Sequence, residues 1–369
     1  MKRYECTGCG ACYNACTNGC IVMKKAFDGC YYPAINREEC ISCGKCIKVC
    51  PVRNASENNK EYKISDVYVG HSKDGGIRAA SSSGGIFPLA ADWIISQSGV
   101  VFGACFQKSK VVHVAAGCKK EITQLKGSKY VQSDIKETYL EAEAVLKKEK
   151  PVLFTGVPCQ IEGLKSYLGK EYKNLYTIDL ICHGVGAPGI WEKYLAVFHK
   201  KKEIKEINFK NKDNGWNHEQ FVIKYADGRE YRRNPLDDCY TCGFNTNVFL
   251  RPSCYNCKFK GIERNCDLTI GDAWGVERYA PKFHDDKGCS LILVHSKKGE
   301  EVFEAISEWI EWKKVDINKA VRFNQRMISS AIVSSGRESF YEDLKKYPFR
   351  IAMNKMKKRE KMKNEYSSK

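Results

Sequence analysis

Apolar and polar positions alternate along residues 63–295 in a pattern that predicts strands and helices in turn. Short apolar runs of strand length lie at 63–70, 100–106, 111–116, 151–155, 174–181, 268–271 and 289–295. Helical spacing covers 86–97 and 136–149, and another helix begins near Gln160. Residues 203–232 have the pattern of β structure with a turn at Ala226-Asp227-Gly228, and from about 298 the pattern is helical and basic. Strands alternating with helices favour an α/β domain.

The first fifty residues follow a different rule, which is set by cysteine. The motif C-x2-C-x2-C-x3-C occurs twice, from Cys6 to Cys16 and from Cys40 to Cys50, and Pro51 closes the second copy. This spacing is typical of two 4Fe–4S clusters, each taking its fourth ligand from the other run. The predicted ligands of the first cluster are Cys6, Cys9, Cys12 and Cys50, and those of the second are Cys40, Cys43, Cys46 and Cys16.

Zinc and disulfides explain these runs less well. Zinc sites use cysteine pairs and would leave ligands over in each triplet, and disulfides would require an exported chain. One departure from the motif matters: the first run lacks a closing Pro and continues to Cys20, which could compete with Cys16 as a ligand.

A second group of cysteines comprises Cys239, Cys242, Cys254, Cys257 and Cys266. Two C-x2-C pairs are compatible with a zinc ribbon. A third iron–sulfur cluster is the alternative, and it would draw on Cys159 and Cys182, which each follow a predicted strand. Spacing alone leaves this choice open, because those ligands are distant in the chain.

Two small-residue loops are candidates for an anion site. Ser81-Ser82-Ser83-Gly84-Gly85 runs directly into the helix predicted at 86–97, where free N–H groups and the helix dipole suit a phosphate. Serine is also a common N-cap, so the loop alone is weak evidence. The stretch from Gly127 through Ser128, Lys129 and Tyr130 is a second polar, Gly-led loop.

Length and charge narrow the class of protein. The chain has 369 residues, 43% of them hydrophobic, and a net charge of +17. No apolar run reaches the ~18 residues of a membrane span, and no leader precedes Cys6, so we expect a cytoplasmic, reduced protein, with an anaerobic host as a further guess. Residues 350–369 hold eight Lys or Arg against Glu360 and Glu365. This basic surface suits an acidic redox partner or is simply solvated; no nucleic-acid-binding motif accompanies it, so we expect no nucleic-acid partner.

Several motifs occur together in a known order. They are S-S-S-G-G-I at 81–86, L-K-G-S-K-Y-V-Q-S at 125–133, G-V-P-C-Q at 156–160, D-L-I-C-H-G at 179–184, R-P-S-C-Y-N-C-K-F at 251–259 and D-L-T-I-G-D-A-W-G at 267–275. In this order the chain resembles the family of coenzyme F-420 hydrogenase/dehydrogenase beta subunits over roughly residues 60–310. The resemblance implies FAD beside one 4Fe–4S cluster held by Cys159, Cys182, Cys254 and Cys257. It also implies that Ser83, Gly84, Gly85, Gly127, Ser128, Lys129 and Tyr130 lie on the flavin side.

We assign two residues to the flavin chemistry by hypothesis. Lys129 would place a positive charge near the flavin, where it would stabilise the anionic reduced ring. His183 would donate to a cluster sulfur or flank the flavin, although a turn histidine is nearly as good an interpretation. Cys239, Cys242 and Cys266 depart from the family pattern; they are redox thiols, a further metal site or buried side chains. Cys105, Cys118 and Cys289 are predicted to be buried small side chains.

The predicted fold class is α+β or α/β in four parts. These are a two-cluster ferredoxin-like module at 1–55, the two parts of one α/β flavin-binding domain at 63–150 and 151–312, and a helical basic C-terminus at 313–369. The predicted function is electron transfer between ferredoxin-type carriers and a two-electron substrate through FAD. A deazaflavin-linked oxidoreductase and an electron-transfer subunit that serves a separate enzyme are the alternatives.

Overall fold

A mixed eight-stranded sheet forms the centre of the protein. The structure is a computed structural model that describes residues 2–54, 66–200 and 202–367; the polar stretch 54–63, which lacks hydrophobic periodicity and is interpreted as a linker, falls outside it from residue 55 on. The strand order is β13-β3-β12-β11-β7-β6-β4-β5. In that order the bounds are Ile310–Lys314, Asp66–Ser72, Ser290–Val294, Leu268–Asp272, Leu175–Leu180, Val152–Gly156, Val100–Gln107 and Lys110–Ala116.

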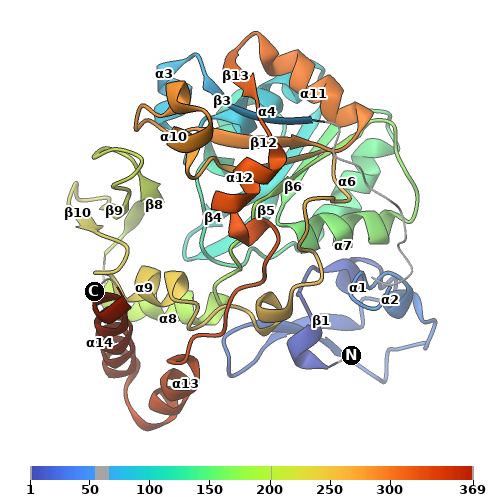
Figure 1. The fold of residues 1–369 in the computed structure, drawn as a ribbon. Helices are drawn as coiled ribbons and strands as arrows, with labels where there is room; N and C mark the ends of the chain where they lie inside the picture. Colours follow the sequence, from blue (N-terminus) through green and yellow to red (C-terminus); the bar gives the residue numbers. More distant parts are fainter. Residues whose placement is uncertain (1, 55–65, 201, 368–369) are drawn as a thin grey trace.

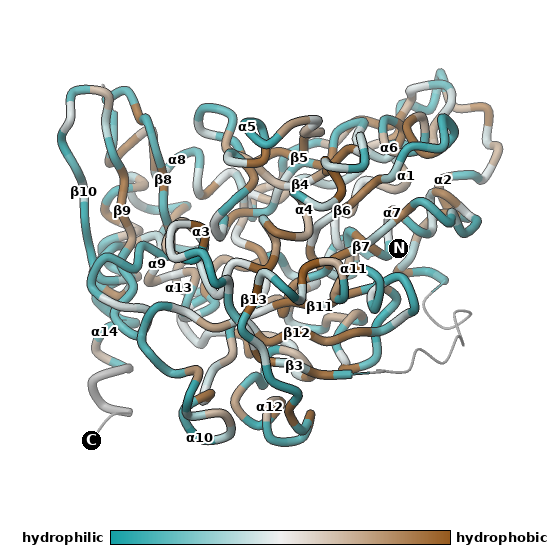
Figure 2. The backbone as a smooth tube through the Cα atoms, turned by 90° about the horizontal axis from the view of Figure 1, so that it is seen from above, coloured by the Kyte–Doolittle hydropathy of each residue, from teal (hydrophilic) through white to brown (hydrophobic). Residues whose placement is uncertain are grey.

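The four middle strands of this sheet, β11, β7, β6 and β4, run parallel, and antiparallel strands flank them on both sides. The middle strands are rich in Val, Ile, Leu and Phe and are almost wholly buried, as expected for strands with helices on both faces. Figure 2 shows hydrophobic residues along β6, β7 and β12 at the centre of the molecule. Because β6 and β7 are parallel neighbours, the residues that follow them meet at one edge of the sheet. Open α/β sheets bind ligands at this edge.

Helices cover both faces of the sheet (Figure 1). The helix α4 packs with α11 and with buried residues such as Ile178 and Ile292 on one face. Buried residues of α6 and α7, among them Tyr139 and Leu164, pack against Phe154 on the other. The helices around the central sheet are α3 (Gly75–Ala79), α4 (Ile86–Ser96), α5 (Lys119–Ile122), α6 (Thr138–Leu146), α7 (Pro158–Leu168), α10 (Val276–Tyr279), α11 (Lys297–Ser307) and α12 (Ile317–Phe323).

The N-terminal module is small and lies beside α7 (Figure 1). Its elements are α1 (Ala11–Asn14), β1 (Ile21–Lys25), β2 (Tyr31–Ile35) and α2 (Lys45–Lys48), and β1 pairs with β2 antiparallel. Gly163 of α7 meets the module so closely that an added Cβ would lie 2.9 Å from the Cβ of Cys9. The module is therefore packed directly against the sheet domain.

A second, three-stranded sheet and the remaining helices complete the fold. The small sheet contains β8 (Ile204–Asn211), β9 (Gln220–Tyr225) and β10 (Glu230–Arg233) in the order β10-β9-β8. The helices α8 (Pro188–Phe198) and α9 (Cys239–Asn245) pack against α14 (Phe349–Ser367), which also contacts α13 (Arg337–Lys346). No helix in the described part of the chain is long and apolar enough to cross a membrane.

The predicted mixed α and β architecture is confirmed, and nearly every predicted strand and helix is present within a few residues. One strand of the central sheet was missed. The region after 298 was predicted to be helical throughout, but β13 pairs with β3 at the edge of the sheet. Four of the five residues of β13 are exposed, so the strand lacks the apolar pattern that would have revealed it.

Candidate cofactor sites

The first thiol site brings Cys6, Cys9, Cys12 and Cys50 together. Burial raises the pKa of Cys9 to about 11, and the neighbouring Cys6 and Cys50 act in the same direction. Burial raises the pKa of Cys12, and its neighbours Cys9, Cys6 and Cys50 add to this effect. The ionisation of Cys9 and Cys12 is thus opposed by burial and by neighbouring thiols, whereas a bound cluster would hold them as thiolates.

The polar groups of the sheet domain hold this first run of cysteines from several sides. Tyr139 donates its hydroxyl to the Cys9 carbonyl oxygen at 2.8 Å, and Gln132 donates to the Thr7 carbonyl oxygen at 2.8 Å. Arg251 donates to the Cys6 carbonyl oxygen at 2.7 Å. These donors are buried, so the loop of the first site is fixed by the larger domain rather than by its own module.

The second thiol site contains an additional cysteine. The sulfur of Cys20 lies 3.3 Å from that of Cys16, and the Cys40 thiol also acts on Cys20. The hydrogen bond with Cys16 and burial together raise the pKa of Cys20 to about 12. Cys43 and Cys46 flank Gly44, whose left-handed φ of 73° begins α2. The structure therefore brings Cys20 to the site that the motif assigns to Cys16.

The third thiol site collects cysteines from three distant segments. Cys159 lies in the first turn of α7, Cys182 follows β7, and Cys254 and Cys257 lie in and after the short 3-10 helix η3 (Pro252–Asn256). Burial raises the pKa of Cys159, and its neighbours Cys257, Cys182 and Cys254 add to that effect. The four thiols implied by the family resemblance therefore converge.

Thiols of the first and third sites are also neighbours of each other. The Cys9 thiol acts electrostatically on Cys159. An added Cβ at Gly163, one turn along α7 from Cys159, would lie 3.0 Å from the Cys9 sulfur. Within the described residues, no three His, Cys, Asp or Glu side chains converge on a single-ion position, so the first and third sites rest on the proximity of their thiols, and the second rests on the proximity of Cys16, Cys20 and Cys40 together with the motif.

A cavity of about 600 Å³ opens beside the third site. This volume is within the usual range for a small-molecule or cofactor site. Its wall includes Ser81, Ser82, Ser83 and Gly85 at the start of α4, the loop from Gly127 to Tyr130, and Cys182 and His183 after β7. The two loops predicted from sequence thus face the same space as one of the predicted cluster ligands.

The two small-residue loops are joined directly. The Ser128 backbone N–H donates to the Ser82 hydroxyl at 2.8 Å, and their hydroxyls lie 3.0 Å apart. The N-cap of α4 is Gly85, with φ of 88°, rather than a serine. Gly84 does not line the cavity: an added Cβ there would lie 2.4 Å from the Gly70 carbonyl oxygen, so Gly84 permits a close approach of two backbones.

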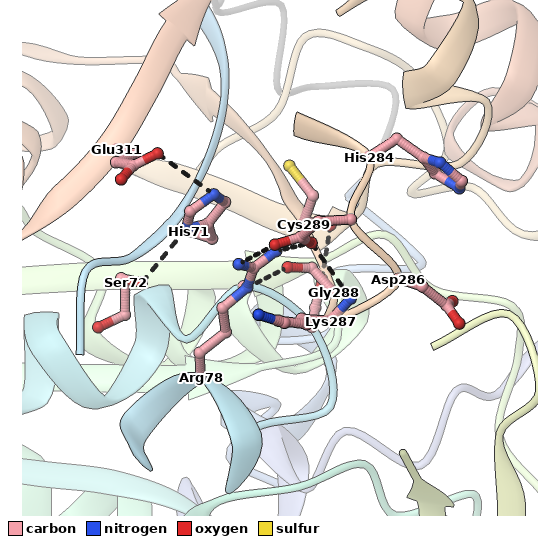
Figure 3. A network of polar contacts seen from close by, with 12 residues as sticks. His71, Ser72, Arg78, His284, Asp286, Lys287, Gly288, Cys289 and Glu311 are labelled. Atoms are coloured by element: carbon pink, nitrogen blue, oxygen red, sulfur yellow. Dashed lines mark hydrogen bonds and ion pairs between the residues drawn. The ribbon is translucent and has the colours of Figure 1, made fainter. Parts of the chain in front are cut away.

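A polar network around Arg78 contacts the serine loop, residues 81–85, and Figure 3 shows the Arg78 side chain hydrogen-bonded to Gly288. Arg78 donates to the Gly288 carbonyl oxygen at 2.8 Å and pairs with both oxygens of Asp285. The Lys212 ammonium donates to the carbonyl oxygens of Arg78 and Ser83 at 2.8 and 2.9 Å. Because Lys212 joins the backbone of the loop at Ser83 to that of Arg78, the N–H and hydroxyl groups of the loop are ordered without a ligand.

Lys129 lies at the cavity wall, but its ammonium is already engaged. Nζ contacts four carbonyl oxygens, those of Gln124, Leu125, Lys126 and Gly127, at 2.8–3.3 Å. An ammonium has only three donors, so none is left over for a ligand. Burial lowers the pKa of Lys129 to about 7, while the carbonyl oxygens favour the charged form. The residue fixes the loop, and only its charge can act on the cavity.

His183 also lines the cavity and keeps one nitrogen free. Its ring lies 5.1 Å from that of Phe244, and Nε2 is buried without a hydrogen-bond partner. Burial lowers the pKa of His183 to about 4, and Arg326 and Lys260 act in the same direction. The imidazole is therefore neutral at pH 7, next to Cys182.

One feature of the cavity was missed from sequence. The buried Lys210 ammonium lies 2.7 Å from Asp272 and 3.0 Å from Glu219. Burial alone would lower the pKa of Lys210, but Asp272 and Glu219 raise it above its usual range. Trp274, which follows Asp272 by two residues, stacks on Trp216 at 4.9 Å. The D-A-W-G motif at 272–275 had indicated Asp272 and Trp274. Nothing in the sequence of the β8–β9 hairpin had indicated Lys210 or Glu219.

The extra cysteines do not join the three thiol sites. Cys239 and Cys242 lie in α9, and burial raises both pKa values, that of Cys242 to about 12, which is the reverse of what dithiol chemistry needs. Cys254 and Cys257 converge with Cys159 and Cys182 rather than with this pair, so no zinc ribbon forms. Cys266 is buried beside Thr269. Cys105 and Cys289 are buried as predicted, but Cys118 is exposed before α5, where no strand covers it.

Comparisons with known proteins agree with this division of the chain. Residues 5–54 match the 4Fe-4S dicluster domain, and residues 149–319 match the family described as the C terminus of the coenzyme F420 hydrogenase/dehydrogenase beta subunit. The F subunit of the F(420)H(2) dehydrogenase from Methanosarcina mazei is 22% identical over 336 residues, which cover 84% of this chain and 85% of that protein. The F420-reducing [NiFe] hydrogenase complex of Methanosarcina barkeri contains a chain that is 16% identical, with a TM-score of 0.49, covering 72% of this chain and 91% of that one.

Proposed function

The chain joins a 4Fe-4S dicluster domain to a C-terminal domain of the coenzyme F420 hydrogenase/dehydrogenase beta subunits, and from this premise we propose that it is an iron–sulfur flavoprotein oxidoreductase. In this proposal it moves electrons between ferredoxin-type one-electron carriers and a two-electron substrate. The first and second thiol sites hold the two clusters of the dicluster domain. The third site holds one more cluster, and the cavity holds FAD.

The observation that carries this proposal is the continuity from the cavity to the surface. Cys182 of the third site lies in the cavity wall, Cys159 of the same site is a neighbour of Cys9, and Cys9 shares the first site with Cys50 from the second run. A row of one-electron carriers that begins at a cavity for an organic cofactor is the arrangement that converts two-electron chemistry into single electrons.

The residues of the cavity fit a flavin nucleotide. FAD, when bound, would supply two-electron exchange with a substrate and one-electron exchange with the clusters. The N-terminus of α4 at Gly85 and the hydroxyls of Ser82 and Ser128 suit the diphosphate. The neutral imidazole of His183 offers an unpartnered nitrogen beside Cys182. Lys129 orders the loop and contributes a charge rather than a hydrogen bond.

The opposite end of the row is exposed. Cys43 of the second run is exposed, and Ile41 and Ile47 beside it are 65% and 52% exposed. Lys45 and Lys48 add positive charge to the same loop. An apolar surface with positive charge suits a transient partner with an acidic rim, so we assign this surface to a ferredoxin or another acidic redox protein.

The division into domains follows from the same proposal. Residues 1–55 form the two-cluster module, and residues 63–150 and 151–312 form the two parts of one flavin-binding unit, since both contribute strands to the central sheet. Residues 313–369 are the basic C-terminal part, which begins inside β13 and has helices α12, α13 and α14 in its described portion.

A deazaflavin-linked oxidoreductase is the second candidate. The name of the relative from Methanosarcina mazei includes reduced F420 as the substrate and describes it as a subunit. On this candidate the cavity would admit the deazaflavin beside the flavin, and the exposed second run would dock on a separate catalytic partner. The candidates differ in the two-electron substrate and in the partner, but not in the row of clusters.

Anaerobic analysis of the purified chain tests the proposal. Iron, sulfide, zinc and released flavin are measured on one sample; about twelve irons and one FAD per chain are expected from three cubanes beside one flavin. About eight irons with zinc and no flavin would refute it. Reduction of the loaded protein by a reduced two-cluster ferredoxin and, in parallel, by reduced deazaflavin then separates the two candidates.

A further inference from the structure

Arg251 is a wholly buried arginine that spans two of the thiol sites. Its side chain is among the largest of the fully buried ones, with 1% of the residue exposed. Its own backbone belongs to the loop of the third site, because the Cys254 N–H donates to the Arg251 carbonyl oxygen at 2.9 Å. Its side chain crosses to the first site, where it reaches Cys6. It thus contacts both groups of ligands.

The acceptors of its guanidinium carry no carboxylate charge. Nε donates to the Cys6 carbonyl oxygen at 2.7 Å, one terminal nitrogen to Gln132 Oε1 at 2.7 Å, and the other to the Tyr31 carbonyl oxygen at 3.0 Å and to the Cys6 sulfur at 3.6 Å. The ring of Tyr32 lies 4.4 Å from the guanidinium. Within the described residues, no ion pair to Asp or Glu is formed by Arg251.

Other buried arginines of this protein are neutralised by acids. Arg264 pairs with Asp179 at 3.2 Å, and Arg78 pairs with Asp285. An unpaired buried charge is costly and is retained only when something compensates it. Around Arg251 the groups able to carry negative charge are three thiols and one phenol: Cys30, Cys6, Tyr32 and Cys254. Burial raises the pKa values of Cys30 and Tyr32 despite Arg251, so the ligand thiols Cys6 and Cys254 are the groups that a cluster would hold as anions.

The sequence of the first run is adapted to this guanidinium. Gly8 and Ser42 occupy the same place in the two cysteine motifs, and both have a left-handed φ, 65° and 55°. A Cβ at Gly8 would lie 2.6 Å from the Arg251 guanidinium nitrogen, which accounts for glycine in the first run. The second run keeps a serine at the same backbone geometry. The two motifs therefore differ at the point where the arginine enters.

We propose that Arg251 is the built-in countercharge of the first cluster and that it raises the reduction potential of that cluster above the value that the same motif gives at the second site. Reduction adds one negative charge to a group already held by four thiolates, so a fixed cation beside a ligand sulfur favours the reduced state. Arg251 is a positioning and tuning residue, because it acts through Cys6. The inference rests on the proposed function, since it requires loaded clusters.

The test is an EPR-monitored redox titration of the anaerobic, iron-loaded full chain, comparing Arg251→Gln, Arg251→Lys and the parent. In Arg251→Gln the reduction potential of one cluster, observed as one reduction wave, should fall. The expected change is about tenfold in the equilibrium constant in favour of the oxidised state, which is 59 mV for a one-electron couple. Arg251→Lys keeps the charge and should shift that wave by less than about threefold. Arg337→Gln is the control for loss of a partly buried arginine: among the described residues Arg337 donates to the carbonyl oxygens of Val248 and Leu250 and to the Tyr255 hydroxyl, and no cysteine sulfur is among these acceptors.

A second pair of variants keeps the arginine and moves it. Gly8→Ser makes the first motif like the second and displaces the guanidinium from Cys6, whereas Ser42→Gly makes the reverse change where no arginine enters. Gly8→Ser should shift the same wave as Arg251→Gln by about threefold, and Ser42→Gly should shift none. This pair decides the question if Arg251→Gln does not hold its irons.

The outcomes separate the two proposals. A parent chain without three clusters would refute the proposed function. A fully loaded Arg251→Gln with all waves unmoved, equal shifts in Arg251→Gln and Arg251→Lys, or an unmoved wave in Gly8→Ser would overturn the countercharge and leave the proposed function standing.

Discussion

The two cysteine runs carry the same motif in opposite surroundings. In the first run Thr7 and Ala11 are buried, and buried groups of the sheet domain hold Cys6 and Cys9. At the matching places in the second run Ile41 and Lys45 are exposed. One copy is enclosed by the rest of the protein and the other faces outward.

From this difference we infer that the motif determines the cluster ligands, whereas the surrounding residues determine what each cluster does in electron transfer. Solvent exposure, net charge and hydrogen bonds to sulfur are the means by which a protein tunes a cluster. An enclosed site next to the third site suits transfer within the molecule, and an exposed site suits transfer to a partner. Variants that alter one run, or a group outside both runs as a reference, test this difference.

The largest effect is expected where the second run meets its partner. Replacing Ile41 and Ile47 together with Asp removes the exposed apolar surface and adds negative charge beside Lys45 and Lys48. Electron uptake from a reduced two-cluster ferredoxin should slow at least tenfold, because an acidic donor is repelled and loses its contact. Stopped-flow absorbance at several donor concentrations gives the second-order rate.

The control for this change is Met362→Asp, at an apolar residue 47% exposed in the basic C-terminal part. It should leave the rate within about twofold. A slower rate in Met362→Asp with an unchanged rate in the double variant would place docking on α14 and contradict the assignment of the second run.

Steric crowding separates the runs next. Gly10 and Gly44 match in the motif and have nearly the same left-handed φ, 78° and 73°. A Cβ at Gly10 would lie 3.1 Å from the Ile135 Cβ, whereas nothing lies within 4 Å of one at Gly44. Both alanine variants carry the backbone strain, so Gly10→Ala should lose about 1–3 kcal/mol more in the free energy of unfolding, from overpacking. Anaerobic chemical denaturation measures both; equal losses would show that the first run is not confined.

Acid should weaken the sheet domain rather than the two runs. Residues 1–54 contain no histidine, whereas burial lowers the pKa values of His113 and His199 to about 4 and of His295 to about 3. As pH falls below about 6.5 the unfolded chain binds protons that the folded chain does not, so the free energy of unfolding decreases. The decrease is on the order of 1.4 kcal/mol per pH unit for each such histidine and continues down to the folded pKa.

His199→Gln tests the acid effect, because it removes the share of one histidine. Denaturation curves at pH 6.5, 5.5 and 4.5 should show a shallower loss of stability than in the parent. The exposed His218, changed to Gln, is the reference substitution. Parallel curves for all three proteins would refute the linkage.

The smallest effect is expected at the spare thiol of the second run. Cys16→Ser and Cys20→Ser should each keep close to the full iron content, because the two sulfurs lie 3.3 Å apart and one can replace the other. The double variant should lose about four irons per chain, which is one cubane. Loss of four irons in either single variant would identify that cysteine as the sole ligand.

Sequence patterns predicted the fold well where burial was one-sided or complete. The strands β6, β7 and β11 and the helix α4 lie at apolar runs, and these runs can be kept from water in few other structures. The exposed edge strand β13 escaped, since it is specified by its neighbour β3 rather than by its own pattern.

The candidate sites divide in a similar way. Local spacing was enough to group Cys6, Cys9 and Cys12. A third cluster that includes Cys159 and Cys182 was one of two alternatives left open by spacing. Only the family resemblance selected it and gave Cys254 and Cys257 as the other ligands, because the three segments that hold these cysteines are distant in the chain. The engagement of Lys129 with backbone carbonyls and the position of Arg251 are three-dimensional facts that no spacing encodes.

The central claim is that the first site links the second site to the third and to the cavity. The direct test mixes reduced two-cluster ferredoxin with flavin-loaded parent protein and with Cys9→Ala, and follows the flavin absorbance and the EPR of freeze-quenched samples. The account predicts that Cys9→Ala still accepts an electron at the second cluster while its flavin stays oxidised for at least a hundred parent half-times. Flavin reduction in Cys9→Ala at the rate of the parent would contradict it.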